Sequence, residues 1–163
     1  MSRTQQYWWL HDARWYQEVA KRFGFDAANE INKEAIAFVA RRIAQNVAKA
    51  QGVPVRDMTW DQVVEIIKRC PEEMWPPQFV DYRYDASTPG ELTTSLERNF
   101  ALTMSRTAGT LDTYQCPCLE LRAAWHEGLG LDVESDSIEG CLKDGADACT
   151  YKARFRGYAP AGQ

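Results

Sequence analysis

Four of the five cysteines lie in the last third of the chain, at Cys116, Cys118, Cys141 and Cys149. The first two flank a proline in the tract CPC, and the last two enclose the loop LKDGADA. Thiolates are good zinc ligands, and a tetrahedral zinc site takes about four nitrogen or sulfur donors. The group therefore indicates a thiolate-rich zinc site. A disulfide, a redox-active Cys-Pro-Cys pair and ordinary core packing are the alternatives.

Two further side chains are candidate ligands for this metal, Glu139 and His126. The chain has only two histidines, which excludes a site built mainly from imidazole and favours zinc or another thiophilic ion. The fifth cysteine, Cys70, stands apart in front of Pro71, and we interpret it as a packing residue.

A second candidate site lies near the start of the chain, in WWLHDARW. His11 is a candidate general base near neutral pH, with Asp12 beside it. Trp8 and Trp15 fall on the same helical face as Asp12, and aromatic side chains suit the wall of a pocket for a flat ligand. The alternative is a structural role, in which Asp12 is hydrogen-bonded and the tryptophans belong to the core.

Two polar residues of the next helical segment, Asn32 and Arg41, are candidate contacts for the same small organic ligand. The segment they belong to, about residues 27–50, repeats apolar residues at helical spacing. We expect its core face to hold the following residues: Ala28, Ile31, Ala35, Val39, Ile43 and Val47.

The first half of the chain predicts three helices, at about 6–23, 27–50 and 59–70. The stripe of Trp8, Asp12, Trp15, Val19 and Phe23 predicts the core face of the first. Asp26 is the expected cap of the second helix. Thr59 and Gln62 form a capping box at the start of the third, and the proline-rich tract CPEEMWPPQ is expected to end it.

The second half predicts mainly strands. Period-two alternation indicates strands at 79–85, in 131–141 and from 149, and β-branched residues indicate one or two more within 91–104. A helix is expected from Pro117 to Gly128 or Gly130. The fold class is therefore α+β, with N-terminal helices followed by an antiparallel sheet that one helix crosses. We expect one domain over residues 1–163, with a helical part (1–75), an α+β part (76–158) and a tail (159–163).

The charge and composition of the chain limit the classes of partner that it can bind. Residues 76–163 hold 8 basic and 13 acidic residues, a balance that disfavours nucleic acid. No apolar run approaches the ~20 residues of a membrane helix, and the first residues lack a hydrophobic signal core. We therefore expect a cytoplasmic protein that makes no membrane contact. The sequence also lacks a phosphate-binding loop, a dinucleotide glycine fingerprint and a nucleophile elbow.

The tract from Cys116 to Phe155, CPCLELRAAWHEGLGLDVESDSIEGCLKDGADACTYKARF, resembles the C-terminal half of vinyl-reductase-type small-molecule-binding domains. Those domains occur in bacteriochlorophyll synthesis and in aromatic-sensing bacterial regulators. The resemblance implies zinc ligands at Cys116 or Cys118, Cys141 and Cys149. Sensor members complete the site with a glutamate where this chain has Ile138, and Glu139 comes one residue late. A second thiol of the CPC pair would then replace that glutamate.

The whole chain, including HDARWYQEVAKRFGFDAANEIN, is similar to prokaryotic proteins grouped with the L-2-amino-thiazoline-4-carboxylate hydrolase-like family. That resemblance implies an α+β fold and keeps a small hydrolase using His11 and Asp12 as an alternative. A homodimer is expected by analogy with such domains. The leading hypothesis is a small-molecule-binding domain with a structural zinc site, and a thiol redox protein is the third possibility.

Overall fold

The computed structural model describes residues 3–76 and 78–158, so the tail expected at 159–163 lies outside the described residues. Helices and strands follow one another in this order: α1 (Arg3–Phe23), α2 (Phe25–Lys49), η1 (Val55–Asp57), α3 (Trp60–Met74), β1 (Val80–Asp85), β2 (Glu91–Asn99), α4 (Phe100–Thr107), α5 (Cys118–Leu129), β3 (Val133–Gly140), η2 (Leu142–Asp144) and β4 (Cys149–Phe155). The predicted α+β class is confirmed.

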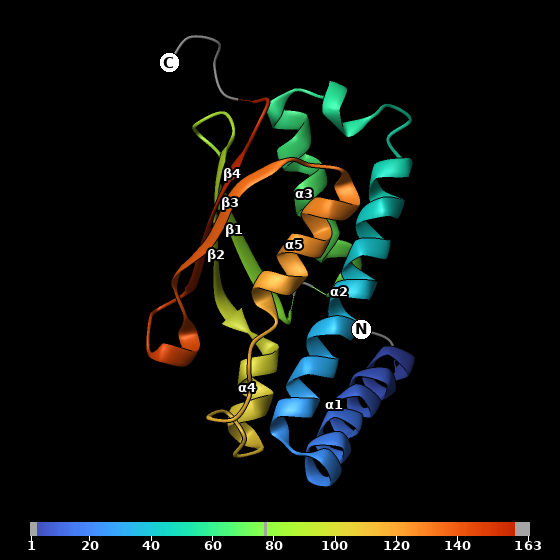
Figure 1. Ribbon diagram of the computed structural model, residues 1–163, viewed down its shortest axis with the longest axis vertical. Helices are drawn as coiled ribbons and strands as arrows, with labels where there is room; N and C mark the ends of the chain where they lie inside the picture. Colours follow the sequence, from blue (N-terminus) through green and yellow to red (C-terminus); the bar gives the residue numbers. More distant parts are fainter. Residues whose placement is uncertain (1–2, 77, 159–163) are drawn as a thin grey trace.

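The four strands form one antiparallel sheet in the order β1-β2-β4-β3. Helices α3 and α5 cover one face of this sheet, and α2 packs along α5 on the side away from the strands (Figure 1). The register places Leu92 of β2 opposite Ala153 of β4, and both side chains are completely buried under the helices. The sheet is therefore an amphipathic layer with one face in the core.

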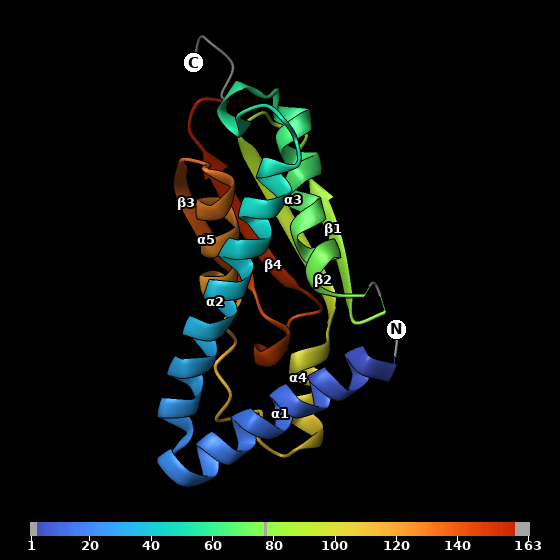
Figure 2. The same ribbon diagram turned by 90° about the vertical axis from the view of Figure 1, so that its right-hand side faces the viewer.

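Helix α1 crosses the end of the molecule beside α4 and the N-terminal half of α2 (Figure 2). Its inner face consists of Trp9, Ala13, Tyr16 and Ala20, at helical spacing. Trp9 stacks on Phe79, with ring centroids 4.7 Å apart. The prediction that Trp8 and Trp15 lie on the core face of α1 was therefore wrong. Both stripes are apolar, and contact with Phe79 and α4 selects the one that holds Trp9.

In helix α2, too, the buried face differs from the predicted one. Its core residues are Ala28, Asn29, Ala40, Ala44 and Val47. Two residues of the predicted face, Ile31 and Val39, are 38% and 45% exposed. The prediction of this face was therefore wrong for these two residues and for Ala35, which is also exposed. Ala40 and Ala44 are completely buried, and Ala44 packs closely against Gly128 of α5.

Three local predictions need correction. Helix α3 continues through Pro71 to Met74, because Pro71 and Cys70 extend its buried face and the packing outweighs the missing N–H. Strand β2 ends at Asn99, whose side chain accepts a 3.3 Å hydrogen bond from Leu102 N and starts α4 instead of more strand. Helix α2 begins after Gly24, so Asp26 lies in its first turn and does not cap it.

Two local predictions hold. The capping box of Thr59 and Gln62 is present at the start of α3. Gly130 ends α5 in the left-handed conformation, with φ 74°.

Candidate functional site

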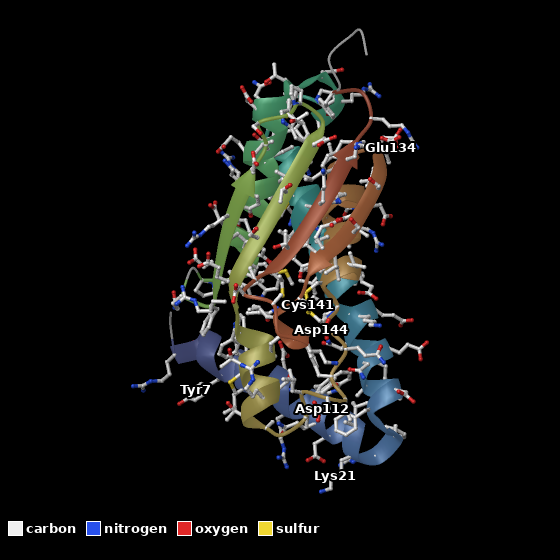
Figure 3. All side chains as sticks on the ribbon, turned by 90° about the vertical axis from the view of Figure 1, so that its left-hand side faces the viewer. Tyr7, Lys21, Asp112, Glu134, Cys141 and Asp144 are labelled. Atoms are coloured by element: carbon white, nitrogen blue, oxygen red, sulfur yellow. A yellow bond between two sulfur atoms is a disulfide. The ribbon has the colours of Figure 1, made fainter. Side chains whose placement is uncertain are left out.

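The four C-terminal cysteines, which come from three separate segments, meet in one cluster. Cys149 is buried with Leu96, Leu102, Tyr114 and Tyr151, and the partly buried Cys116, Cys118 and Cys141 pack against this group. Figure 3 shows sulfur atoms beside the labelled Cys141, where the β3–β4 connection approaches the loop before α5. The β3–β4 hairpin brings Cys141 and Cys149 together.

The sulfurs form two pairs. Cys116 and Cys118 are joined by a disulfide, whereas Cys141 and Cys149 are free thiols. The backbone N–H of Leu142 donates to Cys149 Sγ at 3.4 Å. Burial raises the pKa of the Cys149 thiol, the Leu142 N–H opposes that shift, and Cys141 adds to it. Cys149 is therefore held as a neutral thiol until a cation or a base approaches it.

Polar side chains hold the loop that carries Cys116. Asn29, which is 1% exposed, donates to Thr113 O at 2.8 Å and accepts from Gln115 N at 3.0 Å. Lys143, from the β3–β4 connection, donates to Tyr114 O at 2.7 Å. These bonds position the loop from two sides. Nothing in the sequence distinguishes Asn29 as a site residue, because asparagine is common near the start of a helix.

The four C-terminal cysteines can bind zinc together only when all four are reduced thiols. In the present arrangement two of the four sulfurs are bonded to each other, and residues 3–76 and 78–158 contain no three His, Cys, Asp or Glu side chains placed to hold a metal ion. Neither additional candidate lies with the sulfurs. Glu139 is exposed and accepts from Ser137 Oγ at 2.9 Å, and His126 packs edge-on against Phe155. The zinc site stays a prediction.

The N-terminal candidates do not share a site. Trp8 and Trp15 are 63% and 44% exposed. His11 lies 3.3 Å from Asp12, but their side chains are 62% and 81% exposed. The structure thus places these four residues on an outer face of α1, and they do not line a pocket against the sheet.

The two polar candidates from α2 lie apart from that face and from each other. Arg41 donates to Glu127 of α5 at 2.7 Å, and Asn32 interacts with the Tyr114 hydroxyl. The predicted residues therefore do not assemble a common pocket for a small organic ligand. A catalytic role for His11 and Asp12 and a ligand role for the other four stay predictions.

A cavity of about 350 Å³ lies between α3 and β1, outside the predicted sites. Trp75, Tyr82 and Tyr84 supply its aromatic walls, and Lys68 and Glu72 supply charged groups. The Tyr82 and Tyr84 rings stack with centroids 6.0 Å apart, and burial raises the pKa of both phenols. The available signal for this cavity is the alternating aromatic residues of the tract YRY in β1, a pattern that by itself indicates only a strand.

A buried polar group lies further inside, between α5 and β3. The Arg122 guanidinium donates to both carboxylate oxygens of Asp136, at 3.1 and 3.2 Å, and lies 4.8 Å from the centre of the Tyr151 ring. His126 Nδ1 is 3.5 Å from Asp136, and burial, with the Arg122 charge, lowers the pKa of His126 to about 3. Burial also raises the pKa of Asp136, against the effect of Arg122. This group ties α5 to the sheet.

No model of a protein family, no curated protein and no solved structure matches this chain. In the described part of the chain, no helix has the length and apolar character needed to cross a membrane.

Proposed function

We propose that the protein is a small-molecule-binding domain whose ligand enters the cavity between α3 and β1. The observation that carries this proposal is the cavity itself, about 350 Å³ in volume with Trp75, Tyr82 and Tyr84 in its walls. Ligand pockets are typically concave, largely apolar and about 300–1,000 Å³ in volume, with a few polar groups that orient the ligand. Neutral phenols donate and accept hydrogen bonds, so Tyr82 and Tyr84 suit a flat, polar organic molecule.

Blocking the cavity tests this proposal. Glu72 and its neighbour Glu73 are both exposed, but only Glu72 lines the cavity. Flat aromatic probes such as indole and benzamide would be titrated while backbone amide NMR shifts are followed. Wild type and Glu73→Trp should show saturable shifts in α3 and β1, and Glu72→Trp should lose them. Equal binding by both variants, or no saturable shift in wild type, would refute the site.

We also propose that the reduced cysteine cluster binds one zinc ion through Cys116, Cys118, Cys141 and Cys149. The support is the gathering of four soft donors from three segments into one cluster. Bound zinc would supply a cross-link between the loop before α5 and the β3–β4 hairpin. Its role would be structural, since the binding free energy of such sites contributes directly to folding.

Elemental analysis of reduced protein, purified without a metal-affinity tag, decides the zinc proposal. We expect about one zinc per chain, thiols protected from modification until a chelator is added, and a lower melting temperature afterwards. Cys70 lies in a different part of the core, so Cys70→Ala should keep the metal while Cys149→Ala should lose it. Reduced protein with no zinc and freely reactive surface thiols would contradict the proposal.

The disulfide between Cys116 and Cys118 favours a second function, thiol–disulfide exchange. A thiolate of an external dithiol would attack one sulfur, and its second thiol would release the mixed disulfide, so that two electrons and two protons pass to the cysteine pair. Thiol counting tests this: the oxidised protein should contain three free thiols and the reduced protein five. A measurable equilibrium with glutathione or dithiothreitol would support exchange, whereas five thiols under all conditions would exclude it.

A further inference from the structure

Most of the large apolar side chains that are exposed lie on the two N-terminal helices. Twelve large hydrophobic residues are exposed in the described part of the chain, and eight of them lie between residues 7 and 39. These eight are Tyr7, Trp8, Leu10, Trp15, Phe23, Ile31, Phe38 and Val39. The other four are scattered over the rest of the chain. This enrichment on two neighbouring helices directs the search for an interface to α1 and α2.

Phe38 is the centre of the α2 part of this surface. It is 65% exposed in the middle of the helix, and Ile31 lies two turns before it on the same stripe. Glu34 and Arg42 lie four residues to either side of Phe38, and both are exposed. Their neighbours on α2, Lys33 and Arg41, form ion pairs with α5, but neither Glu34 nor Arg42 has an ion-pair partner among the described residues.

We propose that this surface binds a second copy of the chain, with the two α2 helices packed antiparallel around Phe38. In a two-fold arrangement centred on Phe38, a residue four positions before the centre faces the residue four positions after it in the partner. Glu34 of one subunit then lies opposite the partner's Arg42, and the same pair repeats on the other side of the axis. Opposite charges at symmetric positions are the arrangement that an isologous interface requires.

The aromatic face of α1 completes the interface. A stable dimer buries about 800 Å² on each partner, which is more than one helical stripe provides. Trp8, Trp15 and Phe23 are 63%, 44% and 72% exposed. The C-terminal end of α1 lies beside the start of α2, and the rest of α1 runs away from α2 across α4 (Figure 2). Antiparallel pairing turns the N-terminal half of α2 toward the C-terminal half of the partner's α2. The aromatic residues of α1 thereby extend the contact on both sides of the axis.

The charges around Phe38 favour a second copy over a lipid surface. A helix that binds anionic lipid carries a cluster of Lys and Arg around its apolar face. Here the apolar stripe is flanked by one acid, Glu34, and one base, Arg42. A second copy of the chain is therefore the partner that this surface fits. This conclusion does not depend on the cavity or on the cysteines.

Sedimentation velocity under reducing conditions, over a wide range of protein concentration, tests the proposal. Wild type should show a monomer–dimer equilibrium. Phe38→Glu should weaken association about thirtyfold or more, as expected for a buried aromatic anchor. Val53→Glu changes a residue that is 52% exposed elsewhere and should associate like wild type. Because Phe38 is exposed, circular dichroism should show an unchanged fold in the variant.

Charge reversal tests the register. Glu34→Arg and Arg42→Glu should each weaken the dimer about tenfold, since each places like charges together at both symmetric contacts. The double variant Glu34→Arg/Arg42→Glu should associate within about threefold of wild type. A wild type that stays monomeric at every concentration, or a Phe38→Glu variant that dimerises normally, would overturn the proposal. A double variant as weak as the single ones would overturn the antiparallel pairing.

Discussion

Helices α1 and α5 each carry tryptophan and one of the two histidines, but the two helices place these residues in opposite environments. In α1, Trp8 is 63% exposed and the His11 side chain 62%. In α5, Trp125 and His126 are 4% and 2% exposed. Helix α5 lies between the sheet and α2, whereas α1 is covered mainly along one stripe (Figures 1 and 2). Tryptophan and histidine, which suggest a binding or catalytic site in α1, are therefore part of the core in α5.

This difference shows how the layers of the fold, and not the residue types, assign each helix its role. Burial on two sides makes charged groups costly, and α5 meets this cost with the Arg122–Asp136 pair and a neutral His126, although Trp125 Nε1 is buried without a hydrogen-bond partner among the described residues. A helix covered on one side leaves apolar side chains exposed, and these become available for association. Substitutions around α5 should therefore change stability, and substitutions on the outer face of α1 should not.

The largest effect is expected from Asp136→Ala. This change leaves the Arg122 guanidinium buried without a partner, and it should lower the free energy of unfolding by about 3–5 kcal/mol. Asp132→Ala is the matched control, because Asp132 pairs with Arg156 on the surface, with side chains 64% and 59% exposed. The control should change stability by less than about 1 kcal/mol. Denaturant titration measures both, and similar losses would contradict the buried role of Asp136.

Acid should destabilise the protein through the buried His126. Because burial lowers the pKa of His126 to about 3, the unfolded chain binds a proton below its ordinary pKa of 6.5 while the folded protein does not. The stability that neutral His126 contributes is complete above that pH and declines as the pH falls toward about 3. Near pH 4.5 the loss should reach about 2–3 kcal/mol.

Comparison of wild type with His126→Gln between neutral pH and about pH 4.5 isolates this contribution. The variant should lose less stability on acidification than wild type does, whatever its stability at neutral pH. His11→Gln, on the exposed face of α1, should follow wild type. The same acid sensitivity in His126→Gln and wild type would show that His126 is not the group responsible.

Gly128→Ala tests the tight contact of α5 with α2. A Cβ atom at this position would come within 2.6 Å of the Arg41 carbonyl oxygen and 2.7 Å of the Ala44 Cβ. Although alanine favours helix more than glycine does, this crowding should cost about 1–3 kcal/mol. Gln45→Ala, at an exposed position of α2, serves as the control. A stabilised Gly128→Ala variant would show that the two helices can move apart at little cost.

The smallest effect on stability is expected from Trp8→Ala on α1. In a Phe38→Glu background, which separates folding from association, the change should be within about 0.5 kcal/mol. Trp125→Ala in the same background should cost about 3–5 kcal/mol. Thermal and denaturant unfolding measure both. Comparable losses would mean that the outer face of α1 belongs to the folded core of the monomer.

Short-range patterns in the sequence determined much of the fold. The capping box of Thr59 and Gln62, the alternation in β1 and β4 and the stop at Gly130 all act within a few residues. The gathering of the cysteines was also predictable, because a hairpin brings Cys141 and Cys149 together. What the sequence left open there was which sulfurs bond, since a disulfide, a metal and packing use the same residues.

Tertiary structure decided which faces are buried. Helices α1 and α2 each carry two apolar stripes, so periodicity alone does not select the stripe with Trp9 over the one with Trp8. The same holds for the Arg122–Asp136 pair and for the α3–β1 cavity. In each, a helix and the strand that follows it in the chain supply the residues, which meet only when the helix packs on the sheet. Hydrogen bonding within a turn or a strand depends on neighbours along the chain, whereas burial of a side chain depends on what packs against it.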